Sequence, residues 1–367
     1  MTTPPVEAPS LIVRRLEARD LAERREFDLR MYGPGTRQLD DERFTWLYET
    51  NPARSDEGYD YWVCEDNGRI VGHEAQIAHY LSINGERHRS VWGIDLMVDP
   101  AYRNRTAGPA IATTLFDKFD LGGGLNSSVR GRRMSKTFGV GELGFVDVYI
   151  RPLDLRTAAP QGGIPRRLRP VVTAAAPALP AVDRLLGRAA QVAGAHLEAV
   201  HRFDRRVDEA WEASWPDYPV LTVRDFEATT WRLDQRPDRD RLFRYFLVRR
   251  GHTIGYVAIR HSARTRAMVV VDYLAPVRWV APLMTLAALE ARRMDANALV
   301  CKTINAGADR WLRRAGFLKR HQGLDQEMLF TMMCKDERLA PTVLDVRKWL
   351  VTSADSDLEP AMAAEHG

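Results

Sequence analysis

The sequence predicts an α/β protein with a mixed sheet, made of two copies of one unit. Short apolar runs of strand length alternate with segments of helical spacing along most of the chain. Landmark residues in the first half recur in the same order in the second. The length of 367 residues is sufficient for two domains that each bury a core of their own.

The repeat is visible in landmarks at matching intervals. Trp46 and Trp231 are each followed six residues later by a proline. A hairpin-like pair of strands comes next in both halves, with two glycines four residues apart, and then an apolar strand that carries one aspartate, Asp95 or Asp272. Each half closes on a Gly-Phe step. We interpret this ordered series as an internal duplication.

The elements expected in the first unit follow from hydrophobic periodicity and from turn residues. We expect strands near 11–16, 59–65, 69–80, 89–98, 123–126 and 145–151, and helices near 20–31, 41–49, 108–119 and 129–137.

The domain organisation follows from changes in composition along the chain. We assign residues 11–151 to the first unit and 201–338 to the second. Residues 152–200 are rich in Pro, Ala and Arg, which suits a linker followed by a helix from about residue 181. We expect residues 1–10 to be a disordered leader and 339–367 to form a helix and an acidic tail.

Composition excludes several classes of function. A hydrophobic fraction of 45%, with no apolar run of membrane-spanning length and no signal peptide, predicts a cytoplasmic globular protein. The three cysteines, Cys64, Cys301 and Cys334, are widely spaced, so we expect neither a disulfide framework nor a metal site. A net charge of +4 is too small to indicate a nucleic-acid partner.

A basic turn at residues 99–112, "DPAYRNRTAGPAIA", is the strongest local signal of a ligand site. An apolar strand precedes the turn and a segment of helical spacing follows it. Free N–H groups at a helix start bind anions, and here they run from Arg105 to Gly108 and include Ala110. Arg103 adds positive charge, and Pro109 suits the first helical position.

The wider stretch "DLMVDPAYRNRTAGPAIATTLF" resembles the acyl-CoA pyrophosphate loop of the GNAT superfamily of N-acyltransferases. The Gly-Phe step at Phe145 resembles the strand that ends that family's core, and the paired units resemble a bacterial tandem subgroup. The resemblance covers about 12–151 and 205–333. It implies acetyl-CoA or another acyl-CoA as co-substrate, no metal, and direct attack by the amine of a small molecule such as an amino sugar or a natural-product intermediate. The donor-binding residues that it implies are Met97, Val98, Arg103, Arg105, Thr106, Ala107, Gly108, Ala110, Asn126 and Ser128.

Two departures from the family pattern affect this interpretation. Thr106 stands where the family has its first glycine, so its side chain either crowds the phosphate or contributes a contact. The second unit has "APVRWVAPLMTL" at the matching place, without glycine and with the bulky Trp279. We therefore expect the first unit to bind the acyl donor and the second to be degenerate.

The candidate catalytic residues are Asp95, Glu74, Ser135 and Tyr149. Asp95 lies in the strand that leads into the turn, where the family commonly keeps its base, although its counterpart Asp272 favours a shared structural role. Glu74 and its neighbour His73 point to opposite faces of a strand, so at most one of them faces the site. The family's tyrosine is missing, which leaves Ser135, Tyr149 or water to protonate the leaving thiolate.

Two other functions remain open at this point. A Fem-type peptidyl transferase also pairs two such units but takes its group from aminoacyl-tRNA, and it requires an RNA-binding surface. A non-catalytic scaffold that binds acyl-CoA fits the missing tyrosine and the degenerate second loop.

Overall fold

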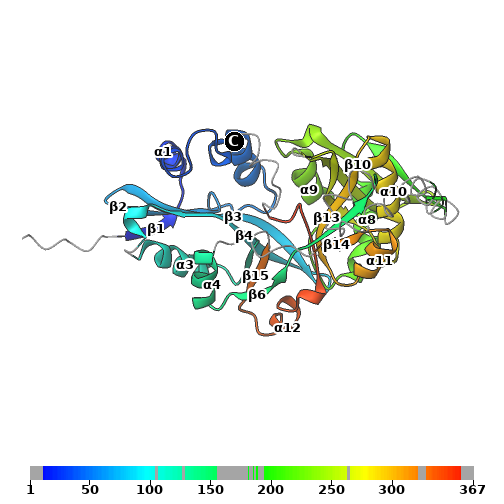
Figure 1. The fold of residues 1–367 in the computed structure, drawn as a ribbon. Coiled ribbons are helices and arrows are strands. Elements are labelled where there is room, and N and C mark those ends of the chain that lie inside the picture. The colour runs from blue at the N-terminus through cyan, green and yellow to red at the C-terminus, as the bar shows by residue number, and fades with distance from the viewer. Residues whose placement is uncertain are drawn as a thin grey trace, which may run out of the picture.

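The computed structural model arranges the chain as two halves joined through one continuous mixed sheet (Figure 1). It describes residues 11–103, 106–125, 129–154, 194–262, 265–320 and 328–356, with isolated positions between 181 and 188. None of the helices in these ranges is both long and apolar enough to cross a lipid bilayer.

The N-terminal half contains the elements expected from the sequence, with boundaries shifted by a few residues. Its strands are β1 (Leu11–Arg15), β2 (Tyr61–Asp66), β3 (Arg69–Ile83), β4 (Glu86–Val98), β5 (Leu121–Leu125), β6 (Gly141–Phe145) and β7 (Asp147–Pro152). Its helices are α1 (Leu21–Tyr32), α2 (Asp41–Phe44, continued by a π-helical turn over Thr45–Glu49), α3 (Ala107–Lys118) and α4 (Val129–Thr137).

The C-terminal half has a similar order of elements, with one additional strand near its start and a short helix and strand at its end. Its strands are β8 (Ala195–Val200), β9 (Val220–Thr222), β10 (Leu242–Arg249), β11 (His252–His261), β12 (Ala267–Leu274), β13 (Ala298–Asn305), β14 (Leu318–Arg320), β15 (Leu329–Cys334) and β16 (Trp349–Thr352). Its helices are α8 (Arg206–Ser214), α9 (Phe226–Thr229, continued by a π-helical turn over Thr230–Asp234), α10 (Val280–Arg293), α11 (Asp309–Arg314) and α12 (Ala340–Val343).

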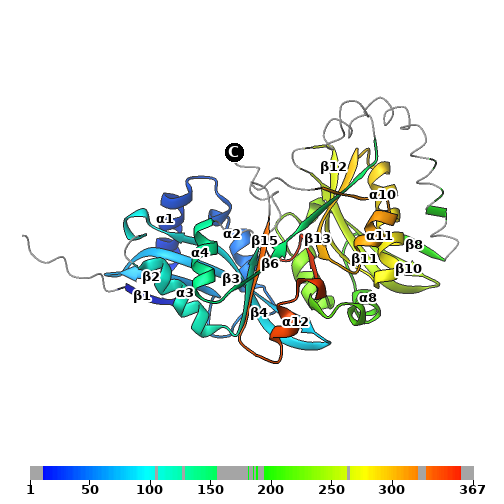
Figure 2. The same cartoon turned by 60° about the horizontal axis from the view of Figure 1, so that its bottom comes forward.

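The two halves exchange their last strands. The order across the sheet is β6-β15-β5-β4-β3-β9-β16-β13-β12-β11-β10-β8. Strand β15, from the C-terminal part of the chain, lies between β5 and β6 of the N-terminal half (Figure 2). Strand β7, from the N-terminal part, pairs with both β13 and β14. Neither half therefore has a complete sheet without the other.

Several expected boundaries need correction. The segment expected to be the end of a helix near residue 200 is strand β8, which pairs with β10. In the region expected to be a C-terminal helix and tail, residues 339–356 form the short helix α12 and then strand β16. The rest of the expected tail, 357–367, and the expected leader, 1–10, lie outside the described residues. The units expected at 11–151 and 201–338 are interlocked, because alternation of apolar residues indicates a strand but does not say which neighbour it joins.

A pair of tryptophans marks the approximate twofold relation between the halves. Trp46 and Trp231, the first landmarks of the repeat, stack with their ring centroids 5.4 Å apart. The indole Nε1 of Trp46 donates to the carbonyl of Trp231 at 2.8 Å, and the indole of Trp231 donates to the carbonyl of Trp46 at 2.7 Å. Both residues lie in the π-helical turns, so the repeated motif forms a symmetrical contact.

The N-terminal part of the sheet has helices on both faces. Helix α1 lies on one face of the β3–β4 layer, and α3 and α4 lie on the other (Figure 1). Ala75 and Ile77 of β3 belong to the same apolar cluster as Phe27 of α1. Because side chains alternate along a strand, Glu74 and Gln76 of β3 point to the opposite face.

Candidate functional site

Strands β4 and β5 run side by side for only two residue pairs. Val91 pairs with Gly122 and Trp92 with Gly123, both in parallel register. Beyond Trp92, β4 continues along β3 as far as Val98, whereas β5 continues along β15. In the described ranges, the edge of β4 from Gly93 onward has no partner in β5, and the carbonyls of Asp95 and Val98 accept from the side chains of Tyr32 and Arg103.

The edge of β4 that β5 leaves ends at Val98, beside the start of helix α3: a Cβ built on Gly108 would lie 4.0 Å from the side chain of Val98. Thr106 is the residue before this helix and has a left-handed backbone, with φ of 68°. Ala107 and Gly108 open the helix, so their N–H groups belong to the donors that lack an intrahelical acceptor. Ala110, which was expected to be a free donor, instead donates to the carbonyl of Thr106 at 2.9 Å. The helix begins at Ala107, so Pro109 is its third residue rather than its first.

Of the two arginines in the turn, the structure describes Arg103. The guanidinium of Arg103 folds back onto the end of β4, where its Nε donates to the carbonyl of Val98 at 3.0 Å. Met97 pairs with His73 across the β3–β4 ladder. Four residues with predicted roles lie outside the described residues, wholly or in their side chains: Arg105, Asn126, Ser128 and Ser135.

Asp95 lies at an irregularity of β4 next to the divergence. The β3–β4 register shifts between Ile94 and Met97, and Asp95 has φ of 52°. Its carboxylate accepts hydrogen bonds from Gln38 at 2.9 Å, Arg43 at 3.0 Å and Arg37 at 3.2 Å.

The environment of Asp95 makes its carboxylate a weak proton acceptor. Burial alone raises the pKa of this group, but the charges of Arg43 and Arg37 outweigh burial and lower the pKa to about 2. At neutral pH Asp95 is therefore ionised and held by cations. Its geometry is that of an anchor between β4 and the segment that joins α1 to α2.

His73 is also engaged on the face of the sheet that holds α1. Its Nε2 lies 2.9 Å from the carboxylate of Asp28, which in turn pairs with Arg24 at 2.8 Å. All three side chains are buried.

Glu74 points to the face that holds α3 and α4, and it has a different environment from Asp95. The side chain keeps some exposure to solvent, yet enough protein surrounds it that desolvation raises the pKa of the carboxyl to about 7. Its oxygen lies so close to Gly93 that a Cβ built on this glycine would be 2.9 Å away. Glu74 therefore lies beside the residue at which β4 loses its β5 partner.

The glycines of β5 have a packing role. A Cβ on Gly123 would overlap the sulfur of Met332 and the backbone oxygen of Thr331. A Cβ on Gly122 would lie 3.0 Å from the side chain of Val91. The close approach at these glycines is made by neighbouring strands.

Tyr149 does not belong to this site. Its strand β7 pairs with β13 and β14, and its hydroxyl donates to Asp309 at 2.6 Å. The expectation failed because the exchanged strand carries this tyrosine into the C-terminal half.

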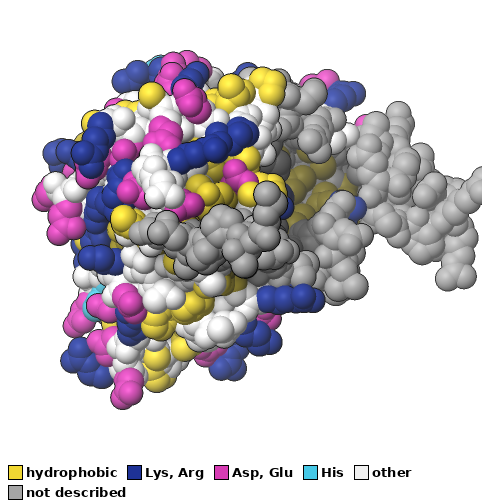
Figure 3. Space-filling view, turned by 90° about the vertical axis from the view of Figure 1, so that its left-hand side faces the viewer, with side chains coloured by type: hydrophobic (Ala, Val, Ile, Leu, Met, Phe, Trp, Pro, Cys, Tyr) yellow, Lys and Arg dark blue, Asp and Glu magenta, His cyan; other side chains and the backbone are white. Residues whose placement is uncertain are grey.

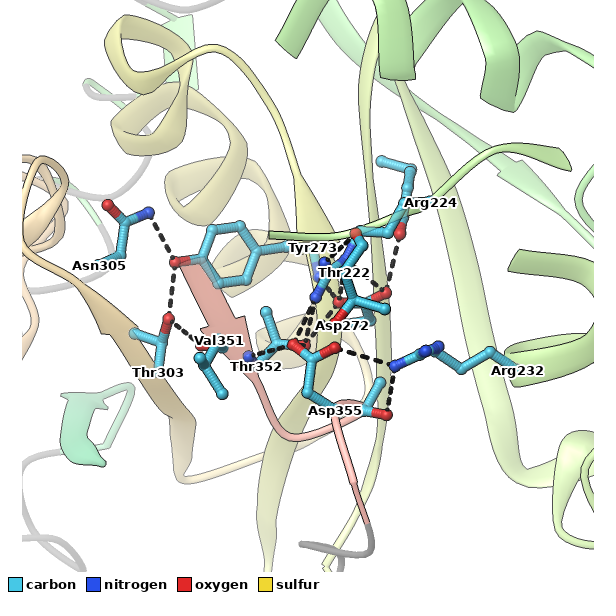
Figure 4. Close-up of polar contacts among 12 residues, drawn as sticks. Thr222, Arg224, Arg232, Asp272, Tyr273, Thr303, Asn305, Val351, Thr352 and Asp355 are labelled. Carbon is cyan, nitrogen blue, oxygen red and sulfur yellow. Dashed lines mark hydrogen bonds and ion pairs between the residues drawn. The ribbon is translucent and has the colours of Figure 1, made fainter. Parts of the chain in front are cut away.

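The matching divergence in the C-terminal half is filled by the chain itself. Strands β12 and β13 pair from Ala267 to Val270, after which β13 pairs with β16 instead. The hydroxyl of Thr352 in β16 donates to Asp272 of β12 at 2.7 Å (Figure 4). This aspartate is the counterpart of Asp95 in the repeat.

Buried ion pairs hold the segment that follows β16. Arg224 lies between two carboxylates, with contacts of 3.2 Å to Asp272 and 2.7 Å to Asp355. Arg232 also pairs with Asp355, at 2.9 Å (Figure 4). All four side chains are at most 5% exposed. The segment after β16 is thus held at the place in the C-terminal half that corresponds to the β4–β5 divergence of the N-terminal half.

Solved structures share this architecture over most of the chain. A probable N-acyltransferase from Enterococcus faecalis V583 matches 91% of this chain and 75% of its own, with a TM-score of 0.60 and 10% identity. A GCN5-related N-acetyltransferase from Anabaena variabilis ATCC 29413 matches 90% of this chain and 74% of its own, with a TM-score of 0.60 and 12% identity. This chain has the GCN5-related N-acetyltransferase (GNAT) fold.

The GNAT match extends to a structure that holds an acyl-CoA. N-myristoyltransferase from Saccharomyces cerevisiae with bound myristoyl-CoA matches 90% of this chain and 84% of its own, with a TM-score of 0.52 and 10% identity. No protein-family model and no curated protein matches the sequence. The likeness is therefore one of fold.

Proposed function

We propose that the protein is an acyl-CoA-dependent N-acyltransferase with one donor site, in its N-terminal half. The observation that carries this proposal is the divergence of β4 from β5 after Trp92 and Gly123, which leaves an edge of β4 that ends at Val98, beside Gly108 at the start of α3. An unpaired strand edge offers main-chain groups to the pantetheine arm and to the thioester carbonyl, and a helix start offers N–H groups to the diphosphate. The C-terminal half is degenerate as a donor site because β16 fills its divergence.

The donor contacts follow the chain from β4 into α3. We assign Met97 and Val98 to the pantetheine arm, and Ala107 and Gly108 to the diphosphate through their N–H groups. Arg103, and Arg105 outside the described residues, supply positive charge. Asn126 and Ser128, which follow β5, are proposed on the opposite side of the donor. Acetyl-CoA is the proposed donor and a small-molecule amine the proposed acceptor.

Glu74 is the proposed general base. The amine nitrogen attacks the thioester carbonyl, the C–N bond forms, and Glu74 takes the proton that the nitrogen loses. The C–S bond then breaks and the thiolate of coenzyme A leaves, protonated by water or by Ser135. A base with a pKa near 7 is ionised in a large fraction of molecules at neutral pH and still holds a proton well. Asp95, with its pKa near 2, meets only the first of these requirements.

The charge distribution favours a small donor over aminoacyl-tRNA. On the face shown in Figure 3, Lys and Arg side chains are interspersed with Asp and Glu. A polyanion is bound by a surface of one dominant sign. This face therefore gives a Fem-type reaction no support.

The test is binding and turnover with the purified protein. We expect calorimetry with coenzyme A to give one site per chain, and a panel of amines with acetyl-CoA to yield an acylated product. Binding without turnover on any amine would instead indicate a scaffold. Two sites per chain would contradict the assignment of the C-terminal half, and transfer from aminoacyl-tRNA alone would establish the Fem-type reaction.

The choice of base is tested by two matched substitutions. Glu74→Gln is expected to lower kcat by about 10²- to 10⁴-fold with little change in KM for the donor. Asp95→Asn is expected to lower the free energy of unfolding by about 3 kcal/mol, because it removes the buried carboxylate charge that pairs with Arg37 and Arg43, while the folded variant keeps the pH profile of the wild type. The reverse pattern would make Asp95 the base.

A further inference from the structure

Gln76 is the polar neighbour of Glu74 on the same face of β3. Its carboxamide Nε2 donates to the carboxylate of Glu74 at 3.2 Å. Gln76 is 4% exposed, and its backbone N–H is held by the carbonyl of Asp60 at 2.8 Å. A buried carboxamide costs free energy unless its polar atoms are paired, so a polar residue at this position needs a reason.

Gly93 lies across the ladder from Gln76, on β4. A Cβ at this position would lie 2.9 Å from Oε1 of Glu74, 3.5 Å from Oε1 of Gln76 and 3.6 Å from its Nε2. The first of these distances is too short for any ordinary side chain. The absence of a side chain at Gly93 therefore leaves the space that the carboxylate and the carboxamide occupy.

A carboxamide N–H group can hold a neighbouring carboxylate in one direction. Nε2 of Gln76 donates to the ionised carboxylate of Glu74, and this hydrogen bond lowers the pKa of the carboxyl against the larger effect of desolvation. A leucine of similar size offers no such contact. Gln76 is thus able to fix the direction of the ionised carboxylate.

We propose that Gln76 and Gly93 are positioning residues that hold the carboxylate of Glu74 at the point where β4 and β5 diverge. The inference rests on the proposed function, since Glu74 acts as the base only in that reaction. Gln76 supplies the hydrogen bond that fixes the direction of the carboxylate, and Gly93 supplies the space. Together they determine the position of the carboxylate oxygen that accepts the proton of the acceptor amine.

The first experiment measures the titration of Glu74 in wild type and in Gln76→Leu. Carboxyl ¹³C resonances of labelled glutamate are followed by NMR, with Glu74→Gln used for assignment. Loss of a hydrogen bond to the ionised form is expected to raise the pKa of Glu74 by about one unit. The acid limb of the pH–kcat profile should move by the same amount, with KM for acetyl-CoA unchanged.

The controls separate positioning from stability. Gln38→Leu removes a carboxamide from Asp95 on the other face and is expected to leave the titration of Glu74 unchanged. An unchanged titration in Gln76→Leu would overturn the inference. If the wild type acylates no amine, the proposed function fails, whereas the NMR arm still reports whether Gln76 holds Glu74.

The second experiment tests the space at Gly93. Gly93→Ala is expected to displace the carboxylate and to lower kcat by about 10- to 100-fold, with KM for the donor within a few-fold of wild type. Gly141→Ala is the matched control, because a Cβ there meets only ordinary contacts, the nearest 3.5 Å away. Equal kcat values for the two variants would contradict a role for Gly93.

Discussion

Glu74 and Asp95 lie on neighbouring strands of one sheet and meet opposite environments. Asp95 faces two arginines, whose charges offset the desolvation of its carboxylate and keep it ionised. Glu74 accepts a hydrogen bond from the neutral carboxamide of Gln76, so desolvation dominates and the pKa of Glu74 rises to about 7. The direction in which each strand residue points thus divides two carboxylates into an anchor and a proton acceptor.

The raised pKa of Glu74 predicts a cost in stability at high pH. Because the folded protein holds this proton more tightly than the unfolded chain, stability is lost as pH rises from about 4.5 through 7. Glu74→Gln removes the cost, so we expect the variant to be more stable than wild type by about 1–3 kcal/mol at pH 8 and about equally stable at pH 4. Urea denaturation at the two pH values measures the difference. A variant that is less stable at pH 8 would show that Glu74 is not desolvated.

The sequence identified Glu74 and Asp95 but could not rank them. Alternation along β3 separated Glu74 from His73, as the structure confirms. Which carboxylate is the better proton acceptor depends on Arg37 and Arg43. These residues contact Asp95 although they precede it by 58 and 52 positions in the sequence. No periodic pattern encodes such a contact. Gln76 was overlooked as well, although its position two residues after Glu74 places both on one face.

At the scale of elements, sequence patterns predicted the turns and strands that depend on neighbouring residues alone. The turns between paired strands were predictable from their glycines, and the structure shows positive φ at Asn67–Gly68 and at Arg250–Gly251. Strand β8 was missed because its alanine-rich surroundings favour a helix, whereas pairing with β10 decides the outcome. Thr106 has a left-handed backbone conformation, which a β-branched residue rarely adopts and which the sequence did not indicate.

The close packing of Gly123 in β5 predicts how a substitution there affects the β5–β15 pair. Gly123→Ala adds a Cβ that overlaps the main chain of β15 at Thr331, so β5 and β15 must separate locally. We expect the free energy of unfolding to fall by about 3 kcal/mol. Gly141→Ala in β6 should be neutral or slightly stabilising, because alanine costs less chain entropy than glycine. Equal stability of the two variants, measured by thermal and chemical denaturation, would argue against the tight β5–β15 contact.

At the scale of the molecule, the exchanged strands make the two halves interdependent. Strand β15 completes the sheet of the N-terminal half, and β7 completes that of the C-terminal half. The β3–β9 pairing and the Trp46–Trp231 contact add further links between them. The sequence predicted two copies of one unit, but the exchange depends on which strand edges meet in space, and strand patterns alone do not specify that.

This interdependence predicts the behaviour of a cut chain. A protease site inserted between residues 155 and 193, in the Pro-, Ala- and Arg-rich segment, leaves every described strand pair intact when it is cleaved. We expect the two fragments to elute together in size-exclusion chromatography and to unfold in one transition, because each fragment holds a strand that the other needs. Residues 11–154 expressed alone should fail to give a stable fold, since β5 and β6 would then expose the edges that β15 covers. Fragments that separate without denaturant, each with its own transition, would show that the halves are independent domains and that the exchange contributes little to stability.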